Sequence, residues 1–389
     1  MIILHYQIFW YRNKSNIKAD SLEKNFYLTP KKGDVMNIKQ KTLTALLVLG
    51  IGMSGCNNND NNPTPPTVEN KTATILENIG SQHSNGSSDI TIAQLQEITP
   101  ALSNIDDRYL NIYQRYIASA DTNISSPATV DEVQSMIYEV NDLNLPEHAI
   151  LDRSFFKKTN GAFEHRFVYL PVENTTTGRT WLNNNLGADY ANVNSSAYNA
   201  SQQATAYNDH LAYGSLFQWG RKADGHELIN WASSTSGTAK YGNTDTKNDN
   251  PSDSLFIKQP SWRVNPDDTL WANESSANNV CPAGYRLPLN PNKANDTANE
   301  FYVETQTWSS QNHSGSMSSD LKLPAAGAYS LLSFSVSYAS DDAEYWTGSI
   351  AATEAARQYP HDLWFHDGTV DANDSAASGT GLSVRCIKN

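Results

Sequence analysis

The spacing of apolar residues divides the chain into a helical segment and a longer segment of short β-like runs. Over residues 90–145, apolar side chains recur three and four positions apart, which is the spacing of one helix face. Thr91 and Thr129 are each followed three residues later by Gln or Glu, as in a capping box. Pro100 is expected to bend or end the first helix. The pattern predicts three helices, whose apolar faces contain Leu95, Ile98 and Leu102; Tyr109, Ile112, Tyr113 and Tyr116; and Val133, Met136, Ile137 and Val140.

From about residue 155 the pattern changes. Short β-like runs, such as residues 167–170 and 383–387, are separated by long polar stretches, and eight of the nine tryptophans lie beyond residue 180. Evenly spaced strands, as in a regular sandwich or a βαβ array, are missing. We therefore expect residues 155–389 to form a β-containing, loop-rich domain built around buried aromatic side chains, preceded by a small three-helix unit at residues 90–145.

Residues 36–56 have the pattern of an export signal. Lys39 and Lys41 form a basic start, residues 43–51 are apolar, and small residues lead to Cys56. The apolar run is far shorter than the ~20 residues that span a bilayer. The ending, Met-Ser-Gly-Cys, resembles the lipobox of bacterial lipoproteins, with Met in place of the more usual Leu. The resemblance implies acylation of Cys56. The alternative is a buried helix that ends in a free thiol.

The segments on either side of this signal are expected to lack a packed core. A signal begins near its own Met, so we interpret Met36 as the start of translation and residues 1–35 as a mis-assigned leader. Residues 31–34 (KKGD) can be encoded by a purine-rich, ribosome-binding-like stretch. Residues 57–89, rich in Asn, Ser, Gly and Thr, are predicted to be a flexible linker.

Charge narrows the range of partners. The 389 residues include 28 Lys and Arg against 41 Asp and Glu, a formal net charge of −13. Loss of residues 1–56 removes eight basic and three acidic residues, which leaves 20 against 38 and a net charge of −18. Binding to nucleic acid or to anionic lipid by charge needs clustered Lys and Arg, so neither is expected. Asn57, rather than Asp, follows Cys56, which favours the outer membrane over retention in the inner one.

Six short motifs follow one another in the second half of the chain. Together they resemble the Fibrobacter succinogenes major paralogous domain (FISUMP), over residues 166–389. That family is similar to the C-type-lectin-like fold shared with formylglycine-generating (sulfatase-modifying) enzymes. The resemblance implies an α+β domain with a small twisted antiparallel sheet, extensive loops and a late strand at residues 383–388. The motifs are GRTWLNNNLG (178–187), YGSLFQWGR (213–221), CPAGYRLP (281–288), LPAAG (323–327), YWTGS (345–349) and GLSVRCIK (381–388).

Most motif residues have a structural explanation. After lipidation of Cys56, only Cys281 and Cys386 remain, and an exported protein is in an oxidising compartment, so we expect them to form a disulfide. The remaining motif residues are expected to fill the core, to bond loop backbone and to form turns. These are Trp181, Trp219 and Trp346 for the core, Asn183 and Asn185 for the loops, and Gly214 and Gly327 for the turns.

The sequence contains only partial matches to known metal-binding or catalytic motifs. Asn265-Pro266-Asp267 partly matches the triplet of lectin calcium sites, but no Trp-Asn-Asp follows, and a solvated acidic turn at Asp267 and Asp268 is favoured over a Ca²⁺ site. His361 and His366 are five positions apart, so an extended strand would point them to opposite faces and a shared metal is not expected. No phosphate loop, nucleophile elbow or metalloprotease helix occurs in the sequence. We predict no catalytic residues, no metal and no cofactor.

These expectations lead to a functional hypothesis. We predict a non-enzymatic lipoprotein anchored in the bacterial outer membrane, facing the periplasm or the surface, whose C-type-lectin-like head binds an extracellular glycan or protein. The helical unit would act as a spacer. Two alternatives stay open: an enzyme related to the formylglycine-generating group, which requires a free thiol at Cys281 or Cys386, and a structural envelope protein. Sugar stacking on an exposed tryptophan is the expected mode of adhesion, with the candidates Trp231, Trp262, Trp271 and Trp308.

Overall fold

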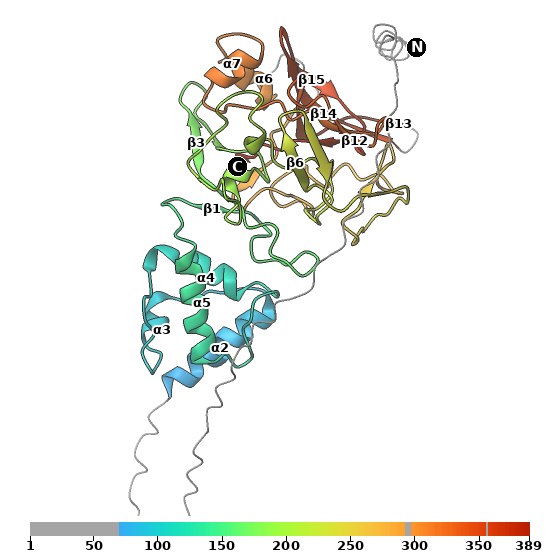
Figure 1. Cartoon of the computed structure of the whole chain (residues 1–389). Coiled ribbons are helices and arrows are strands. Elements are labelled where there is room, and N and C mark those ends of the chain that lie inside the picture. The colour runs from blue at the N-terminus through green and yellow to red at the C-terminus, as the bar shows by residue number, and fades with distance from the viewer. Residues whose placement is uncertain (1–69, 292–296, 355–356) are drawn as a thin grey trace, which may run out of the picture. The chain divides into compact units, whose positions relative to one another are not determined.

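The computed structural model describes residues 70–291, 297–354 and 357–389 (Figure 1). The export signal, Cys56 and the first part of the predicted linker lie outside these residues. Within the described part, no helix combines the length and apolarity that a membrane crossing requires. The described chain is of the α+β class, with a few short helices and several small sheets, as predicted.

The helical segment confirms the capping boxes. The side chains of Thr91 and Thr129 each accept a hydrogen bond from the backbone three residues on, and Gln94 and Glu132 bond back to the cap. On the last helix, Val133, Met136, Ile137 and Val140 are all buried, as expected from their spacing. A 3₁₀ turn at Asp107–Tyr109 leads into the middle helix. The helices here are α2 (Lys71–Asn85), α3 (Ile92–Gln96), α4 (Leu110–Ile117) and α5 (Val130–Asp142).

The predicted linker at residues 57–89 is wrong over its second half, because α2 occupies it. The Asn70 side chain caps the helix by accepting from the Ala73 amide, and Gly86 ends it in a left-handed conformation. Ile75 and Ile79, four residues apart, are buried. A Cβ on Gly80 would lie 2.6 Å from the carbonyl oxygen of Ser125, so the glycine lets α2 pack closely on that loop. The unit therefore contains four helices instead of three.

The helices share their core with the start of the following segment. The apolar cluster of the helical unit also contains Leu151, Phe155, Phe156 and Val168. The Arg115 guanidinium on α4 donates to the carbonyl oxygens of residues 151 and 152, at 3.2 and 2.5 Å. About fifty residues are too few for a well-buried core of their own. The shared cluster supplies the missing apolar surface, so the unit is not a separate spacer domain in this structure.

Beyond residue 150 the chain forms small sheets joined by long loops (Figure 1). The first contains β3 (Pro171–Asn174), β4 (Arg179–Leu182), β10 (Tyr285–Arg286) and β17 (Ile387–Lys388), in the order β10-β17-β4-β3. The second contains β5 (Phe217–Gln218), β11 (Ala328–Ser330), β12 (Ser335–Ser337) and β16 (Gly381–Leu382), in the order β12-β11-β16-β5. The third contains β13 (Ala343–Glu354), β14 (Arg357–His366) and β15 (Thr369–Ser375), in chain order.

The remaining elements are two-stranded pairs and two short helices. β1 (Ile150–Leu151) pairs with β2 (Val168–Tyr169), and β6 (Ile229–Ser233) with β7 (Ser236–Ala239). β8 (Asn243–Thr244) and β9 (Phe256–Ile257) form a parallel pair, whereas all the other named strand pairs in the described chain are antiparallel. The helices are α6 (Glu300–Thr305) and α7 (His313–Ser318).

The motif residues meet in one core. Ile387 on the late strand β17 lies opposite Trp181 on β4, so the end of the chain pairs with the first motif. The indole of Trp219 donates to the Thr347 carbonyl at 2.8 Å, and that of Trp346 donates to the Phe217 carbonyl at 2.7 Å. These bonds let the rings lie fully buried without an unpaired polar group. The expected core role of Trp181, Trp219 and Trp346 is confirmed.

The predicted polar roles are also confirmed. The Asn183 side chain accepts from the Leu170 amide and donates to the Ala200 carbonyl. Gly214 and Gly327 have φ values of 75° and 64°, the left-handed region that glycine adopts without strain. At Gly214 a Cβ would also lie 2.3 Å from the Leu186 oxygen. Both positions therefore favour glycine, because it adopts the left-handed backbone without strain and because a Cβ would clash with neighbouring backbone.

Arg385 of the last motif is a buried cation held by neutral oxygens. Its guanidinium bonds twice to Asn185 Oδ1, at 2.9 and 3.1 Å, and donates to the carbonyl of Leu321 at 2.7 Å. Burial lowers the pKa of this guanidinium to about 10. Because these bonds reach Asn185 of the first motif and the loop just before the fourth motif, Arg385 connects three core segments that are far apart in the sequence.

Candidate functional site

Three of the four tryptophans predicted to stack on sugars are buried. Trp262, Trp271 and Trp308 are only 1%, 0% and 7% exposed. The indole of Trp262 donates to the Trp219 carbonyl at 2.7 Å, and Trp308 packs edge-on against a phenylalanine ring. The prediction of exposed platforms is wrong here, because loops without many strands gain most of their buried area by packing around large rings.

Trp231 is the candidate that stays partly exposed. It lies on β6, donates from its indole to the Gly214 carbonyl at 2.7 Å, and meets the Tyr213 ring edge-on. A Cβ on Gly237 would lie 2.6 Å from the Trp231 ring, so the neighbouring strand β7 covers one of its faces. Trp231 therefore offers a limited ring edge rather than an open stacking face.

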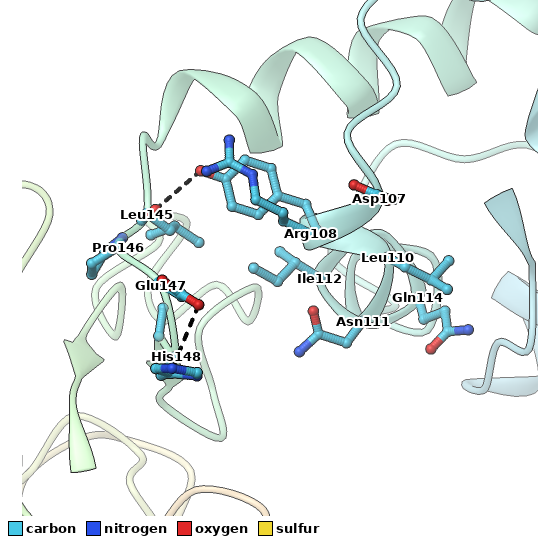
Figure 2. A pocket seen from close by; sticks show the side chains of 12 residues that line it. Asp107, Arg108, Leu110, Asn111, Ile112, Gln114, Leu145, Pro146, Glu147 and His148 are labelled. Carbon is cyan, nitrogen blue, oxygen red and sulfur yellow. Dashed lines mark hydrogen bonds and ion pairs between the residues drawn. The ribbon is translucent and has the colours of Figure 1, made fainter.

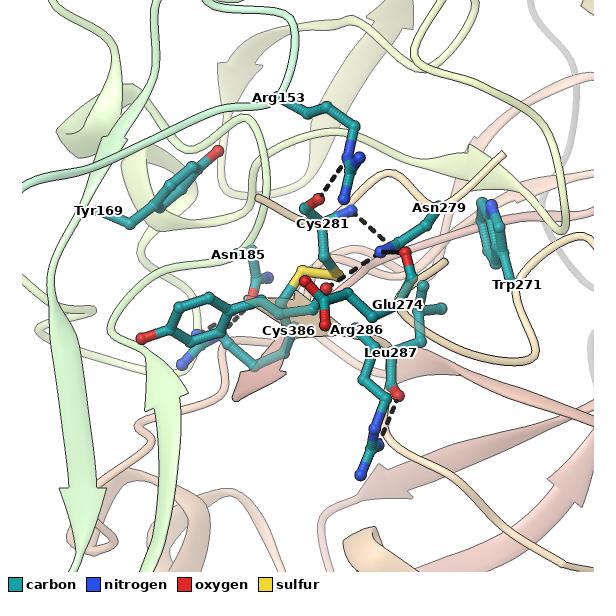
Figure 3. The surroundings of a disulfide bond; sticks show 12 residues. Arg153, Tyr169, Asn185, Trp271, Glu274, Asn279, Cys281, Arg286, Leu287 and Cys386 are labelled. Carbon is teal, nitrogen blue, oxygen red and sulfur yellow. Dashed lines mark hydrogen bonds between the residues drawn. A yellow bond between two sulfur atoms is a disulfide. The ribbon is translucent and has the colours of Figure 1, made fainter. Parts of the chain in front are cut away.

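Cys281 and Cys386 form the predicted disulfide, with Cα atoms 5.9 Å apart (Figure 3). Both residues are fully buried. The Arg153 guanidinium donates to the Cys281 carbonyl at 2.9 Å, and the Asn279 side chain accepts from the Cys281 amide at 3.0 Å. The bond joins the segment before β10 to the segment before β17. Neither sulfur is a free thiol in this structure.

An open pocket of about 580 Å³ lies in the helical unit (Figure 2). Its lining comes from the start of α4 and from the loop after α5. The Tyr109 hydroxyl donates to the Leu145 carbonyl and so joins the start of α4 to the loop after α5. The side chains of Arg108, Glu147 and His148 are 69%, 84% and 76% exposed, so water surrounds their charges. A pocket that fixes a ligand needs a few precisely placed polar groups shielded from water, and this one lacks them among its described lining residues.

A second group of polar residues has the composition of a metal site but is satisfied by hydrogen bonds. Ligand atoms of Asp224, His226 and Glu227 lie within 4.8 Å of one another. Nε2 of His226 accepts from the Gln218 amide at 3.1 Å, so Nδ1 carries the proton and donates to Asp224 at 2.8 Å. A metal at Nδ1 would have to displace this proton and leave an anionic ring. The group is therefore better described as a buried hydrogen-bond network.

His165 completes this network. Its Nε2 lies 2.7 Å from Oε1 of Glu227, whose other oxygen accepts from the Gly225 amide at 3.0 Å. Although burial alone would raise the pKa of Glu227, the bonds from His165 and His226 hold it well below its usual range. Glu227 is thus an anion enclosed between two histidines, and its role is structural.

The other sequence candidates form local structure. Asp267 accepts from the amide and hydroxyl of Thr269, which is a short turn, as favoured above. His361 and His366 lie on β14, which is the central strand of the third sheet and not an edge strand. His361 is buried, whereas His366 is partly exposed.

The described chain exposes six large apolar side chains, and half of them lie within seven residues. Leu332, Phe334 and Tyr338 are 91%, 42% and 45% exposed. They lie on the β11–β12 hairpin and just after it, and we call these three residues the apolar hairpin patch. Residues 323–340 contain no charged residue, in a chain that is 18% charged. An exposed, uncharged and apolar segment of this kind commonly marks a binding surface.

Serine hydroxyls hold the tip of this hairpin together. The Phe334 amide donates to the Ser330 carbonyl at 2.9 Å, and the hydroxyls of Ser333 and Ser337 lie 2.9 Å apart. Phe334 and Tyr338 have φ values of 51° and 60°. Left-handed backbone is costly for bulky side chains and is often found at functional sites. The hairpin thus holds two aromatic residues in a conformation that an ordinary turn would avoid.

A second hairpin, formed by β6 and β7, lies next to the apolar hairpin patch. β12 packs beside β7, which pairs with the strand carrying Trp231 (Figure 1). The Lys258 ammonium lies 4.9 Å from the centre of the Phe334 ring. Sequence reasoning missed this surface, although Leu332, Phe334, Val336 and Tyr338 alternate with serines at period two. That alternation is the signal of a strand with one apolar face.

Comparison with known proteins finds no matching family model, no matching curated protein and no matching solved structure.

Proposed function

We propose that this chain is a non-catalytic, lipid-anchored envelope protein whose C-type-lectin-like head binds an extracellular glycan through the apolar hairpin patch. The observation that supports this function most directly is the clustering of Leu332, Phe334 and Tyr338 on one uncharged hairpin. Anchoring rests on the lipobox-like sequence before Cys56, and the family resemblance supports the fold of the head.

The chemistry of the patch favours a neutral glycan over a protein. Aromatic rings present flat apolar faces to the C–H faces of a sugar, and the serine hydroxyls between them offer donors and acceptors to its hydroxyl groups. The rest of the molecule is acidic, and an uncharged ligand is not repelled by it. A stable protein interface needs about 800 Å² from each partner, more than three side chains supply.

The disulfide bears on the enzyme alternative. An oxidase of the formylglycine-generating type requires a reactive thiol at Cys281 or Cys386, and the pairing of the two sulfurs leaves neither available. This supports the binding function over catalysis. Thiol labelling of the exported protein under non-reducing conditions tests the point, because a labelled cysteine would return the enzyme to consideration.

Glycan binding should depend on the patch. The double variant Phe334→Ala with Tyr338→Ala is expected to weaken retention on a glycan array about tenfold or more, since each stacked ring contributes about 1 kcal/mol. The measurement uses the full chain in detergent. Tyr138→Ala is the matched control, because Tyr138 is also 45% exposed but lies on α5.

The outcomes separate the alternatives. Equal losses in the patch variant and in Tyr138→Ala would remove the patch as the site. Absence of any glycan retention, combined with patch-dependent capture of a defined extracellular protein, would replace the glycan by a protein ligand. Unchanged thermal unfolding of both variants establishes that the loss concerns binding and not folding.

A further inference from the structure

The sequence contains two Asn-Gly pairs, Asn85-Gly86 and Asn160-Gly161. Asparagine is a thermolabile residue. The amide nitrogen of the next residue can attack its side-chain carbon Cγ, and glycine hinders this attack least because it has no Cβ. The reaction needs no enzyme and converts asparagine to an aspartyl residue. Both pairs are therefore similarly reactive in an unfolded chain, and the fold decides which of them reacts.

The end of α2 protects the first pair. Asn85 is the last residue of the helix, and the Gly86 amide donates to the His83 carbonyl at 3.1 Å. The next amide, of Ser87, donates to the Gln82 carbonyl at 3.1 Å, which completes the helix cap. These bonds fix the Gly86 nitrogen and share its proton with a carbonyl oxygen. Attack on the Asn85 side chain therefore requires the end of the helix to open.

The second pair forms an unprotected turn. Thr159 and Ala162 exchange both backbone hydrogen bonds, at 2.8 and 3.0 Å, and only Asn160 and Gly161 lie between them. Their φ values of 49° and 82° are those of a type I′ turn. Both residues are exposed, and the Gly161 amide makes no hydrogen bond to any residue that the structure describes. A Cβ on Gly161 would meet no atom within 4 Å, so solvent reaches this amide.

We propose that Asn160 is a site of spontaneous deamidation in the folded protein. A base in the solvent removes the Gly161 amide proton, and the nitrogen forms a bond to Cγ of Asn160. The Cγ–Nδ2 bond breaks, Nδ2 takes up a proton from water and leaves as ammonia, and a succinimide ring remains. Water then opens the ring at either of its carbonyl groups, which gives aspartate or isoaspartate. Water is the only reactant consumed, and no group is oxidised or reduced.

This turn lies beside the buried network of histidines and carboxylates. The Thr159 hydroxyl is 3.5 Å from Nδ1 of His165, and the Asn160 amide donates to the Ser254 hydroxyl oxygen at 3.4 Å. That hydroxyl donates its own proton to the Asp224 backbone carbonyl at 2.5 Å. A carboxylate at position 160 has no proton to donate, so the bond to Ser254 is lost after deamidation.

Each product also disturbs the turn in its own way. The Asn160 side chain hydrogen bonds to Tyr241, whose hydroxyl bonds to the Glu164 carboxylate, so aspartate brings a second negative charge to the same phenol. Isoaspartate adds a methylene group to the backbone. Because the length of a hairpin loop sets the register of its flanks, the two bonds between Thr159 and Ala162 cannot both form around it. Deamidation therefore loosens the turn, independently of the glycan-binding patch.

Peptide mapping of the full chain, incubated in detergent at mildly alkaline pH, tests the proposal. Trypsin cleaves after Lys158 and Arg166, and Asn160 is the only amide side chain in the peptide between them. Mass spectrometry should detect the exchange of NH₂ for OH in this peptide, as separate aspartate and isoaspartate forms. Asn85 in the same sample should be modified at least about tenfold less, because its reaction requires local opening of α2.

The chain unfolded in urea provides the matched control. Unfolding releases the Gly86 amide, so Asn85 and Asn160 should then react at similar rates, and the incubation lasts until both have reacted in urea. An Asn160 that stays intact in the folded protein over this time would overturn the proposal. Equal modification of Asn85 and Asn160 in the folded protein would also overturn it, because the fold would then make no difference.

The effect on the turn is measured with Asn160→Asp, which reproduces one product. This variant is expected to unfold several degrees below the freshly prepared wild type. The incubated wild type should shift in the same direction as its modified fraction grows. An unchanged unfolding temperature in both samples would overturn the loosening of the turn.

Discussion

Replacement of Glu227 by glutamine should lower the free energy of unfolding by about 3–5 kcal/mol, the usual cost of removing one partner of a buried ion pair. Glu227 is fully buried and accepts from His165 at 2.7 Å and from the Gly225 amide at 3.0 Å. Glutamine keeps the shape but leaves the His165 ring without its anion. Urea unfolding followed by tryptophan fluorescence measures the change.

An exposed glutamate provides the control for this variant. Glu173 lies on β3 with its side chain exposed, so Glu173→Gln should change stability by less than about 0.5 kcal/mol. A loss below about 1 kcal/mol in Glu227→Gln would contradict the assignment of an ion pair and indicate a neutral network.

The pair of His165 and Glu227 should also make the free energy of unfolding depend on pH. Burial alone would lower the pKa of His165, but the bond and the charge of Glu227 outweigh it and raise this pKa above the usual 6.5. A raised histidine pKa stabilises the fold below about pH 6.5, and this contribution is lost as the pH rises through the folded-state value. Because the pKa of Glu227 is lowered in the folded protein, the contribution of Glu227 to stability is fully present at all pH values above about 4.5.

The pair should therefore stabilise the protein most between about pH 4.5 and 6.5 and less at higher pH. The quantity to compare is the difference in unfolding free energy between wild type and Glu227→Gln, because other titrating groups then cancel. This difference should shrink from pH 6 to pH 9. A constant difference over that range would show that His165 is neutral in the folded protein.

Removal of the disulfide should have an effect of similar size. Cys281 and Cys386 are 105 residues apart, and closing a loop of about 100 residues contributes about 4.7 kcal/mol in the chain-entropy model. Replacement of both cysteines by alanine should lower the free energy of unfolding by roughly 3–5 kcal/mol. Urea unfolding of the variant and of the reduced wild type should give similar losses.

The reduced wild type separates the cross-link from the packing of the sulfur atoms. Both cysteines are fully buried, so the alanine variant also loses some packing. A wild type whose stability is unaffected by reduction would show that the loop is already constrained by β10, β17 and their neighbours. The disulfide would then be dispensable for the fold.

Local signals predicted local structure well. Thr91 and Thr129 marked helix starts because a capping box is complete within four residues. The roles of Asn183 and Gly214 were also predicted, because side-chain-to-backbone bonds and left-handed turns depend on residue type. Both kinds of feature are determined by a few neighbouring residues, so a single sequence contains them.

Features set by long-range packing were missed. In α2 the buried Ile75 and Ile79 are surrounded by polar residues, and the composition resembled a linker. Trp262 and Trp271 lie in polar stretches, yet their rings are buried by segments that no local pattern identifies. The pairing of Asp362 with Asp374 could not be predicted either, because it depends on the register of β14 against β15.

The helix α2 also limits how far the head can stand from a membrane. If Cys56 holds the lipid, 13 residues separate it from the first described residue, Asn70. Fully extended, they span at most about 45 Å, whereas the 33 residues of the linker predicted from composition would span about 110 Å. Formation of α2 thus more than halves the maximum standoff. With so short a tether, the attachment point of the folded part at Asn70 stays within about 45 Å of the bilayer.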